Sequence, residues 1–177
     1  MVILKKLCIV IINYNDYNMT KRLLDNIANY KILDKIVVVD NCSTDNSFSN
    51  LKKLKYNNVD FIKTDDNKGY AYGINYGAKY ILDKYEDVAI IFSNADVIIK
   101  KEEDLKYLKN DLSDDVKVVG PTILEHGTLN RGWKMTSSFI ECLSNLPLIS
   151  RYFKKKLLYY KNDYYSDSTS IVDVVSG

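Results

Sequence analysis

The 177-residue chain has few cysteines, one histidine and almost no net charge. Its 25 basic and 23 acidic residues leave +2, without the strongly basic character of many nucleic-acid-binding domains, so no nucleic-acid partner is expected. The three cysteines, Cys8, Cys42 and Cys142, are far apart and form no CxxC pair, which disfavours a zinc site and a disulfide framework. Reduced thiols in a cytosolic compartment are the simplest interpretation, and Cys8 is expected to face a core.

Long hydrophobic runs are absent as well. The apolar run at residues 7–12 is too short for a signal peptide and far too short to span a bilayer, so we expect a first strand there. The chain has no internal repeats and no low-complexity linker. A chain of this length can form one domain with a real core.

Two glycine-rich phosphate-binding motifs are missing. No GxxxxGK[ST] is present, which excludes a P-loop. No GxGxxG follows the first strand, which disfavours a dinucleotide-binding Rossmann domain. A nucleotidyltransferase on a related sheet would need a glycine-rich, basic loop at that point, and NYNDYN at residues 13–18 does not supply it.

Strand and helix signals alternate through most of the chain. Continuous apolar runs predict short strands, and apolar residues at helical spacing lie between them. We expect strands at 7–12, 36–39, 59–63, 88–92 and 116–119, with helices at 20–30, 43–51 (capped by residues 43–45), 69–84 and from 102 onward. This alternation predicts an α/β fold with a mostly parallel sheet covered by helices on both faces.

Polar clusters follow three of the predicted strands, at residues 13–15, 40–41 and 94–96. Ligands of open α/β sheets bind outside the carboxyl ends of the strands, so these clusters indicate a site. Asp40 can accept hydrogen bonds from a ribose or a base, or it can form an Asx turn into the next helix. Asp96 can hold a divalent cation together with substrate phosphates, or it can be a solvated turn residue.

Three glycines recur every fourth residue at Gly69, Gly73 and Gly77. On a helix they share one face, and each costs up to about 1 kcal/mol of helix propensity relative to alanine. One explanation is very close packing of the helix on the sheet. The other is a helix start that lies against a ligand, with backbone N–H groups and Lys68 offered to phosphate.

The pattern is less regular after residue 121. We expect a helix near 136–146 and a last strand at 171–175. His126 is more consistent with a solvated loop residue, and Trp133 fits either a sugar-stacking platform or the anchor of a lid. The basic and aromatic tract 151–161 fits peripheral contact with an anionic membrane surface, a lipid-pyrophosphate acceptor, or a solvated amphipathic face.

Four ordered motifs resemble family 2 glycosyltransferases of the GT-A fold, and most closely the rhamnosyltransferase-like group. They are IVIINYND, VVVDNCSTDNS, NKGYAYGINYGAKY and IIFSNADV, between residues 9 and 97. VVGP at 118–121 and VDVVSG at 172–177 match later landmarks of that family. The resemblance implies one GT-A domain over 1–177, with a nucleotide-sugar-binding half at 1–121 and an incomplete, truncated acceptor-side half at 122–177.

The resemblance also implies roles for particular residues. Asn13 and Tyr14 would cradle the base and ribose, and Asp40 would contact the nucleobase. The implied nucleotide-sugar-binding set is Asn13, Tyr14, Asp40, Asn67, Lys68, Gly69 and Asn94. Asp96 would ligate Mg²⁺ or Mn²⁺ that bridges the donor diphosphate.

Two departures from the family pattern bear on activity. Asn94 replaces one carboxylate of the metal motif, and the carboxylate general base lies beyond the VSG landmark in the family, so no catalytic residue is assigned; Asp173 is not at that position. The resemblance implies an inverting transfer from a nucleotide-diphosphate sugar to a saccharide or lipid-linked acceptor, in cell-surface polysaccharide synthesis, in the cytoplasm or at the inner face of the membrane. The alternative is a catalytically incomplete nucleotide-sugar-binding or assembly module.

Overall fold

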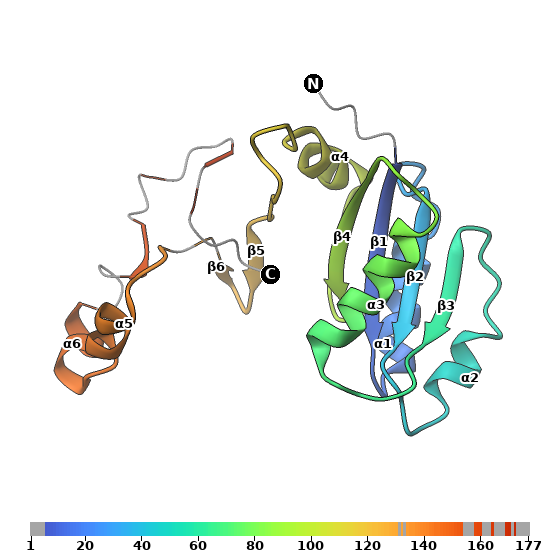
Figure 1. Ribbon diagram of the computed structural model, residues 1–177, viewed down its shortest axis with the longest axis horizontal. Helices are drawn as coiled ribbons and strands as arrows, with labels where there is room; N and C mark the ends of the chain where they lie inside the picture. The colour runs from blue at the N-terminus through green and yellow to red at the C-terminus, as the bar shows by residue number, and fades with distance from the viewer. Residues whose placement is uncertain are drawn as a thin grey trace. The chain divides into compact units, whose positions relative to one another are not determined.

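The computed structural model describes residues 6–130, 132, 134–153, 158–160, 164, 169, 170 and 172. The chain divides into two compact units, Met1–Asn110 and Asp111–Gly177. The first unit holds the strands β1 to β4 with the helices that surround them (Figure 1). The second unit holds a small hairpin and short helices.

The first unit is built on a four-stranded sheet in the order β3-β2-β1-β4. Its strands are β1 (Lys6–Asn13), β2 (Lys35–Asp40), β3 (Val59–Lys63) and β4 (Val88–Asn94). All neighbouring strands pair in parallel. The prediction of a mostly parallel sheet is therefore confirmed. Its central strands are apolar almost throughout because helices cover both faces.

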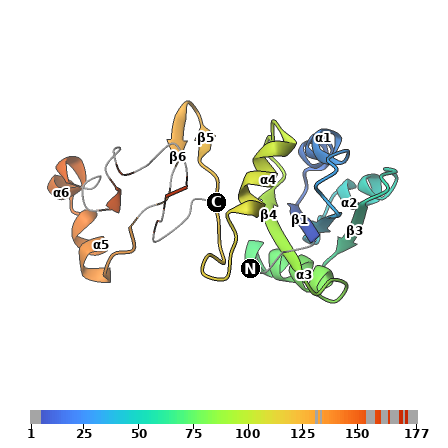
Figure 2. The same cartoon turned by 90° about the horizontal axis from the view of Figure 1, so that it is seen from above.

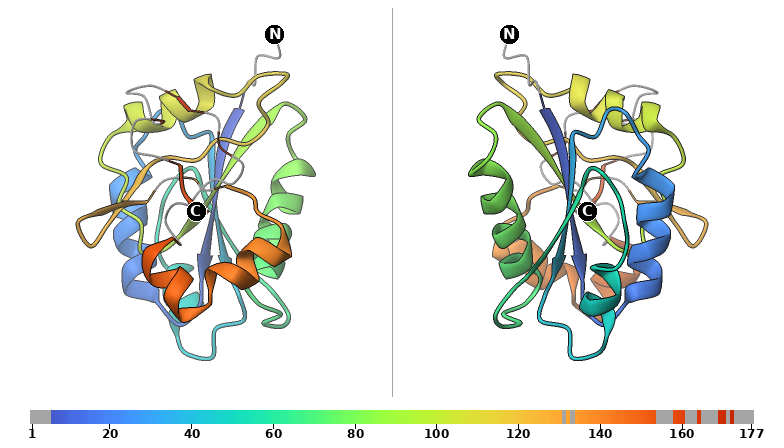
Figure 3. Two further views of the ribbon diagram at one scale, coloured as in Figure 1. Left: turned by 90° about the vertical axis from the view of Figure 1, so that its left-hand side faces the viewer. Right: turned by 90° about the vertical axis from the view of Figure 1, so that its right-hand side faces the viewer.

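Helices lie on opposite faces of this sheet. On one face is α3 (Tyr70–Leu82), and on the other are α1 (Tyr17–Ile27) and α2 (Ser47–Leu51) (Figures 2 and 3). The buried core runs through both interfaces, and its largest fully buried side chains include Leu7, Ile9, Ile11, Leu23, Leu24, Ile27, Ile36, Leu51 and Ile81. Cys8 is also completely buried, as predicted.

Helix starts differ in detail from the predicted ones. The first helix begins three residues earlier than expected, because the Asp16 carboxylate caps it by accepting from the Met19 N–H. Residues 43–45 were predicted to offer caps for the second helix. Ser43 does not cap it, because its hydroxyl donates to Asp40. Asp45 does interact with the helix start, because it accepts from the backbone N–H and the hydroxyl of Ser47.

Close packing explains the two of the three glycines that lie within α3, whereas Gly69 precedes the helix. A Cβ atom at Gly77 would lie 2.5 Å from a methyl group of Val10 and 2.8 Å from one of Val39. A Cβ at Gly73 would lie 3.2 Å from Ile12 Cδ1. Gly69 is different, because a Cβ there would meet nothing within 4 Å but its φ is +92°. That backbone conformation is essentially reserved for glycine.

After β4 the chain passes through residues 95–101 to α4 (Glu102–Asn110), whose first turn is acidic as predicted. The Tyr30 hydroxyl donates to the Ile99 carbonyl (2.9 Å), and the Ile32 N–H donates to Glu102 Oε1 (2.8 Å). These two hydrogen bonds tie the end of this segment and the start of α4 to the loop between α1 and β2.

The second unit departs more from expectation. The predicted strand at 116–119 is wrong, because those residues are irregular. A short hairpin replaces the predicted loop, with β5 (Ile123–Glu125) paired antiparallel to β6 (Thr128–Asn130). The predicted helix near 136–146 is confirmed as α5 (Ser138–Ser144), and α6 (Pro147–Tyr152) follows it. Of the predicted strand at 171–175, only Val172 is described.

Candidate functional site

Strand register brings the predicted polar ends together at one edge of the sheet. Asn13 of β1 pairs with Asp40 of β2, and Asp40 pairs with Lys63 of β3. On the other side of β1, Asn94 of β4 pairs with Ile12. The polar residues that follow three separate apolar runs therefore form one continuous edge, as expected for a ligand site of an open α/β sheet.

Asp40 is the buried centre of this edge. Its side chain has no exposed surface. One carboxylate oxygen accepts from Asn13 Nδ2 (2.7 Å) and from the Ser43 hydroxyl (2.6 Å), and the other accepts from the Ser43 N–H (3.0 Å). The Lys63 ammonium lies 3.7 Å from the second oxygen. These partners compensate the cost of burying a carboxylate, and in this arrangement Asp40 holds its neighbours in place.

Asn13 extends the same network to α1 and to the loop after β2. Its side chain is also completely buried, and its oxygen accepts from the Thr20 hydroxyl (2.8 Å). The Ser43 hydroxyl accepts from the Asn15 N–H (2.9 Å), and Asn15 Oδ1 accepts from the Thr44 N–H (2.8 Å). The loops after β1 and β2 are thus fixed to each other by side-chain hydrogen bonds.

Asn41 connects β2 to the start of α3; the sequence placed it in the polar cluster 40–41 but assigned it no binding role. Its Nδ2 donates to Asn67 Oδ1 (3.0 Å) and to the Gly69 carbonyl (3.1 Å). Its oxygen accepts from the Thr64 hydroxyl (3.2 Å). Asn67 Oδ1 also accepts from the Gly69 N–H (3.0 Å). The predicted residues Asn67 and Gly69 therefore lie at this edge through Asn41.

Three of the predicted residues present exposed side chains near these loops. Tyr14 follows β1 and is 47% exposed. Lys68 is exposed and its ammonium lies 5.4 Å from the centre of the Tyr72 ring. Asn94 is exposed at the end of β4. These side chains are available to a ligand, whereas Asn13 and Asp40 lie beneath the surface.

Asp96 lies in the turn after β4 with its side chain exposed. Burial raises the pKa of the Tyr70 phenol, and the negative charge of Asp96 raises it further, so the carboxylate acts on the first residue of α3. No group of three or more His, Cys, Asp or Glu side chains gathers into a metal site within the part of the chain that the structure describes. Within that part of the chain, Asp96 is therefore an exposed carboxylate that belongs to no cluster of metal-ligating side chains.

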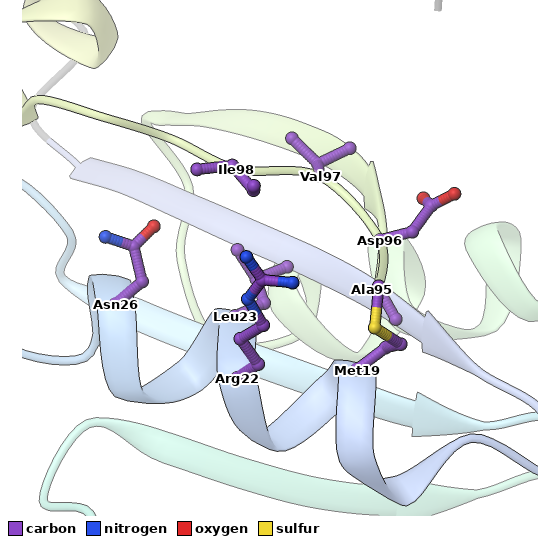
Figure 4. A pocket seen from close by; sticks show the side chains of 8 residues that line it. All are labelled: Met19, Arg22, Leu23, Asn26, Ala95, Asp96, Val97 and Ile98. Atoms are coloured by element: carbon purple, nitrogen blue, oxygen red, sulfur yellow. The ribbon is translucent and has the colours of Figure 1, made fainter. Parts of the chain in front are cut away.

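A pocket of about 230 Å³ lies on the other side of the same segment, between residues 95–98 and α1. Figure 4 shows Arg22 and Met19 extending from α1 toward this segment, while the Asp96 carboxylate points away from α1. The lining residues are Met19, Arg22, Leu23, Asn26, Ala95, Asp96, Val97 and Ile98. No sequence signal had marked the α1 side of this pocket.

The remaining candidates lie outside the edge. His126 is exposed in the turn between β5 and β6 with a φ of +47°, which agrees with a solvated loop residue. Trp133 and Asp173 lie outside the described residues, as does much of the tract 151–161. None of the helices described here is long and apolar enough to cross a membrane.

Comparison with known proteins agrees with this geometry. The profile described as "Glycosyl transferase family 2" matches residues 8–175. The chain belongs to glycosyl transferase family 2. It is 30% identical over 122 residues to the low-salt glycan biosynthesis hexosyltransferase Agl10 of Haloferax volcanii. That match covers 68% of this chain but 38% of Agl10, so the chain spans well under half the length of this family 2 relative.

Comparison with solved structures identifies proteins of similar fold. The mannosyltransferase PcManGT from Pyrobaculum calidifontis, in complex with GDP-Man and Mn²⁺, is similar with a TM-score of 0.50 and 20% identity, over 62% of this chain and 32% of that chain. TarS from S. aureus gives a TM-score of 0.46 at 23% identity over 60% of this chain and 20% of that chain, which is too distant to support an argument. The predicted GT-A type of fold is confirmed for this family 2 chain.

Proposed function

We propose that this chain binds a nucleotide-diphosphate sugar at the carboxyl edge of its sheet and takes part in transferring that sugar to a saccharide or lipid-linked acceptor. The observation that carries the proposal is the joining of three strand ends and the start of α3 by Asp40 and Asn41. Family 2 membership supports it, as do the hexosyltransferase name of Agl10 and the GDP-Man complex of PcManGT.

Within this proposal the donor-binding residues have two kinds of role. Tyr14, Lys68 and Asn94 contact the donor directly, because their side chains are exposed at the edge. Asn13 and Asp40 hold the loops that present those contacts, because they have no exposed surface and their side chains are hydrogen-bonded to each other and to the neighbouring loops. A direct contact between Asp40 and the nucleobase stays a prediction.

We propose that the Asp96 carboxylate holds Mg²⁺ or Mn²⁺ and that the side chain of Asn94 lies near the ion. These cations are commonly bound by one or two carboxylates plus substrate phosphates, so one exposed carboxylate fits the requirement. When bound, the metal supplies neutralisation of the charge on the departing diphosphate. PcManGT, a structure of similar fold, was solved with Mn²⁺ and GDP-Man.

The proposed reaction is an inverting transfer. An acceptor hydroxyl forms a bond to the anomeric carbon as the bond from that carbon to the diphosphate breaks, and a carboxylate general base takes the hydroxyl proton. We assign no residue to this base among the described residues. That observation favours a second candidate, a module that binds the donor and transfers nothing.

The setting of the reaction is also part of the proposal. We place it in cell-surface polysaccharide synthesis of the rhamnosyltransferase-like kind, on the cytoplasmic side, with the tract 151–161 in contact with the inner face of the membrane. Agl10 carries glycan biosynthesis in its name, which supports the broad setting. Co-sedimentation with anionic vesicles tests the membrane contact.

Calorimetric titration with UDP, dTDP and GDP, each with and without Mn²⁺, tests the donor site. We expect one nucleotide to bind in a Mn²⁺-dependent way. Losing the interaction of one charged side chain costs about 1.5–3 kcal/mol, so removing the Asp96 carboxylate in Asp96→Ala should weaken nucleotide binding by roughly tenfold or more. Asp87→Ala is the matched control, because Asp87 is exposed just before the opposite end of β4. A folded chain that binds none of the three nucleotides would contradict the proposal.

Release of nucleotide diphosphate from a sugar donor separates the two candidates. Transferase activity predicts Mn²⁺-dependent release that rises when an acceptor sugar is added. A chain that binds the nucleotide but releases none from the sugar donor would establish the binding-module candidate instead.

A further inference from the structure

The pocket between α1 and residues 95–98 has a charge that the donor site does not use. Arg22 lines it, and the guanidinium extends toward the 95–98 segment (Figure 4). Asp25 lies one turn further along α1, but it binds the ammonium of Lys21 and accepts from the Tyr56 hydroxyl (2.7 Å). Across the described residues, no carboxylate forms an ion pair with Arg22, so its charge is available to a ligand.

Asp96 does not neutralise this arginine although both line the pocket. Its carboxylate points away from α1 (Figure 4), and its charge acts on Tyr70 at the start of α3. A metal-bound diphosphate on Asp96 would therefore lie on the α3 side of the segment. The pocket on the α1 side is a separate place, and it stays positively charged.

The rest of the lining is mostly apolar. Met19 and Leu23 of α1 line it together with Val97 and Ile98, and Asn26 adds one amide group. A volume of about 230 Å³ matches roughly eight water molecules, which is the size of a single sugar ring rather than of a nucleotide. Apolar side chains suit the C–H face of a ring, and an arginine fork suits a carboxylate or phosphate.

The far wall of the pocket is held in position before any ligand binds. The Tyr30 hydroxyl donates to the Ile99 carbonyl (2.9 Å) and accepts from Asn26 Nδ2 (3.4 Å). The Glu102 carboxylate accepts from the Ile32 N–H (2.8 Å) just beyond. Residues of the pocket therefore belong to a hydrogen-bonded frame, which limits the entropy lost on binding.

We propose that this pocket is an acceptor subsite for a sugar unit that carries an anionic group, a carboxylate or a phosphate, with Arg22 as its anion-binding residue. This proposal rests on the proposed function and adds a substrate class to it. The subsite adjoins the backbone of Asp96, so an acceptor bound there lies beside the place where the donor diphosphate is held. Neutral sugars lack the group that Arg22 recognises and bind more weakly.

NMR titration of the whole chain with glucuronate, glucose 6-phosphate and glucose tests the subsite. We expect saturable shifts of the amides of α1 and residues 95–98, with at least one anionic sugar binding roughly tenfold more tightly than glucose. The anionic sugar that binds more tightly identifies the acceptor's anionic group as a carboxylate or a phosphate. Arg22→Gln should abolish that preference and leave Mn²⁺-dependent nucleotide binding unchanged. Lys21→Gln is the matched control on the same helix, because Lys21 is paired with Asp25, and it should keep the preference.

Either of two results with the sugars would overturn the subsite while leaving the proposed function intact. One is nucleotide binding without any preference for the anionic sugars over glucose. The other is a preference that survives in Arg22→Gln. If Arg22→Gln instead weakens nucleotide binding, the arginine belongs to the donor site and the subsite is wrong. Failure of every nucleotide to bind would count against the proposed function itself, so the two failures are distinguishable.

Discussion

The units Met1–Asn110 and Asp111–Gly177 differ in how far their apolar side chains are buried. In the described residues, every buried apolar side chain lies between Leu7 and Leu105. In the second unit, Met135, Phe139 and Val118 are each at least 70% exposed. The difference lies in the architecture, because a parallel sheet with helices on both faces buries whole strands, whereas a two-stranded hairpin has no second layer of its own.

Thiol labelling should show the largest difference between the units. Burial raises the pKa of the Cys8 thiol to about 11, and the side chain is completely buried. Cys142 is exposed in α5. In the native chain at pH 7.5, iodoacetamide should modify Cys142 roughly a thousandfold faster or more, because Cys8 must wait for an opening of the core. Mass spectrometry of timed samples measures both rates, and equal rates would mean that the sheet offers no protection.

Truncating one leucine in each unit should give the next largest contrast. Leu24 is completely buried under the sheet, and Leu24→Ala should lower the free energy of unfolding by about 2–5 kcal/mol. Leu124 is 63% exposed in β5, and Leu124→Ala should change it by less than about 0.5 kcal/mol. Urea unfolding followed by circular dichroism measures both values. A large effect at Leu124 would show that its side chain is covered in solution.

Adding one methyl group to a glycine should separate close packing from backbone strain. Gly77→Ala should cost about 1–3 kcal/mol of unfolding free energy, because the new Cβ would clash with Val10 and Val39. Combining it with Val39→Ala should recover part of the loss, since the double variant removes one clashing methyl. Gly127→Ala meets no atom within 4 Å and strains only a turn with a φ of +78°.

The global unfolding transition of Gly127→Ala should therefore stay near that of the wild-type chain. A Gly77→Ala variant as stable as wild type would mean that α3 lies further from the sheet than described. Either result sharpens the comparison, because one glycine belongs to the core of the first unit and the other to an exposed hairpin.

Acid should weaken the first unit by a smaller amount. Burial opposes ionisation of Asp60, but the hydrogen bonds from Lys35 and Tyr80 lower its net pKa. The stability from this carboxylate is complete above its unfolded pKa near 4 and is lost as the pH falls through the lower folded value. We expect a loss of about 1 kcal/mol or less below pH 4. Urea midpoints at several pH values measure it, and Asp60→Asn should remove this part of the slope; an unchanged slope would contradict it.

The sequence predicted the sheet of the first unit well, because continuous apolar runs bounded by polar residues are a local signal. It failed at residues 116–119, where three valines interrupted by Lys117 form no strand, because a strand also needs a neighbour to pair with. The hairpin was missed because its strands are only three residues long. The signal was His126-Gly127, both of which adopt a positive φ in the turn.

The sequence predicted which polar residues share one edge of the sheet better than it predicted the hydrogen bonds among them. The residues at the strand ends do meet, because parallel strands end at the same edge. Asp40 is buried because Asn13 and Ser43 bind its carboxylate. Asn13 is distant in the sequence, and Ser43 lies in a turn where it was expected to cap a helix instead, so neither partner could be predicted. Asn41 belonged to a predicted polar cluster but had no assigned role, and Arg22 belonged to no motif. Only the register of the sheet and the path of residues 95–101 reveal them.

The glycines of α3 have a consequence for anyone who wishes to change the substrate preference of this chain in the laboratory. A Cβ at Gly73 would meet both Ile12 and the Asn41 side chain, at 3.2 and 3.4 Å. A directed-evolution library at Gly73 would therefore shift Ile12 and Asn41 at the edge of the sheet without changing any side chain that we propose to contact the nucleotide. Libraries confined to exposed residues would never sample this indirect change.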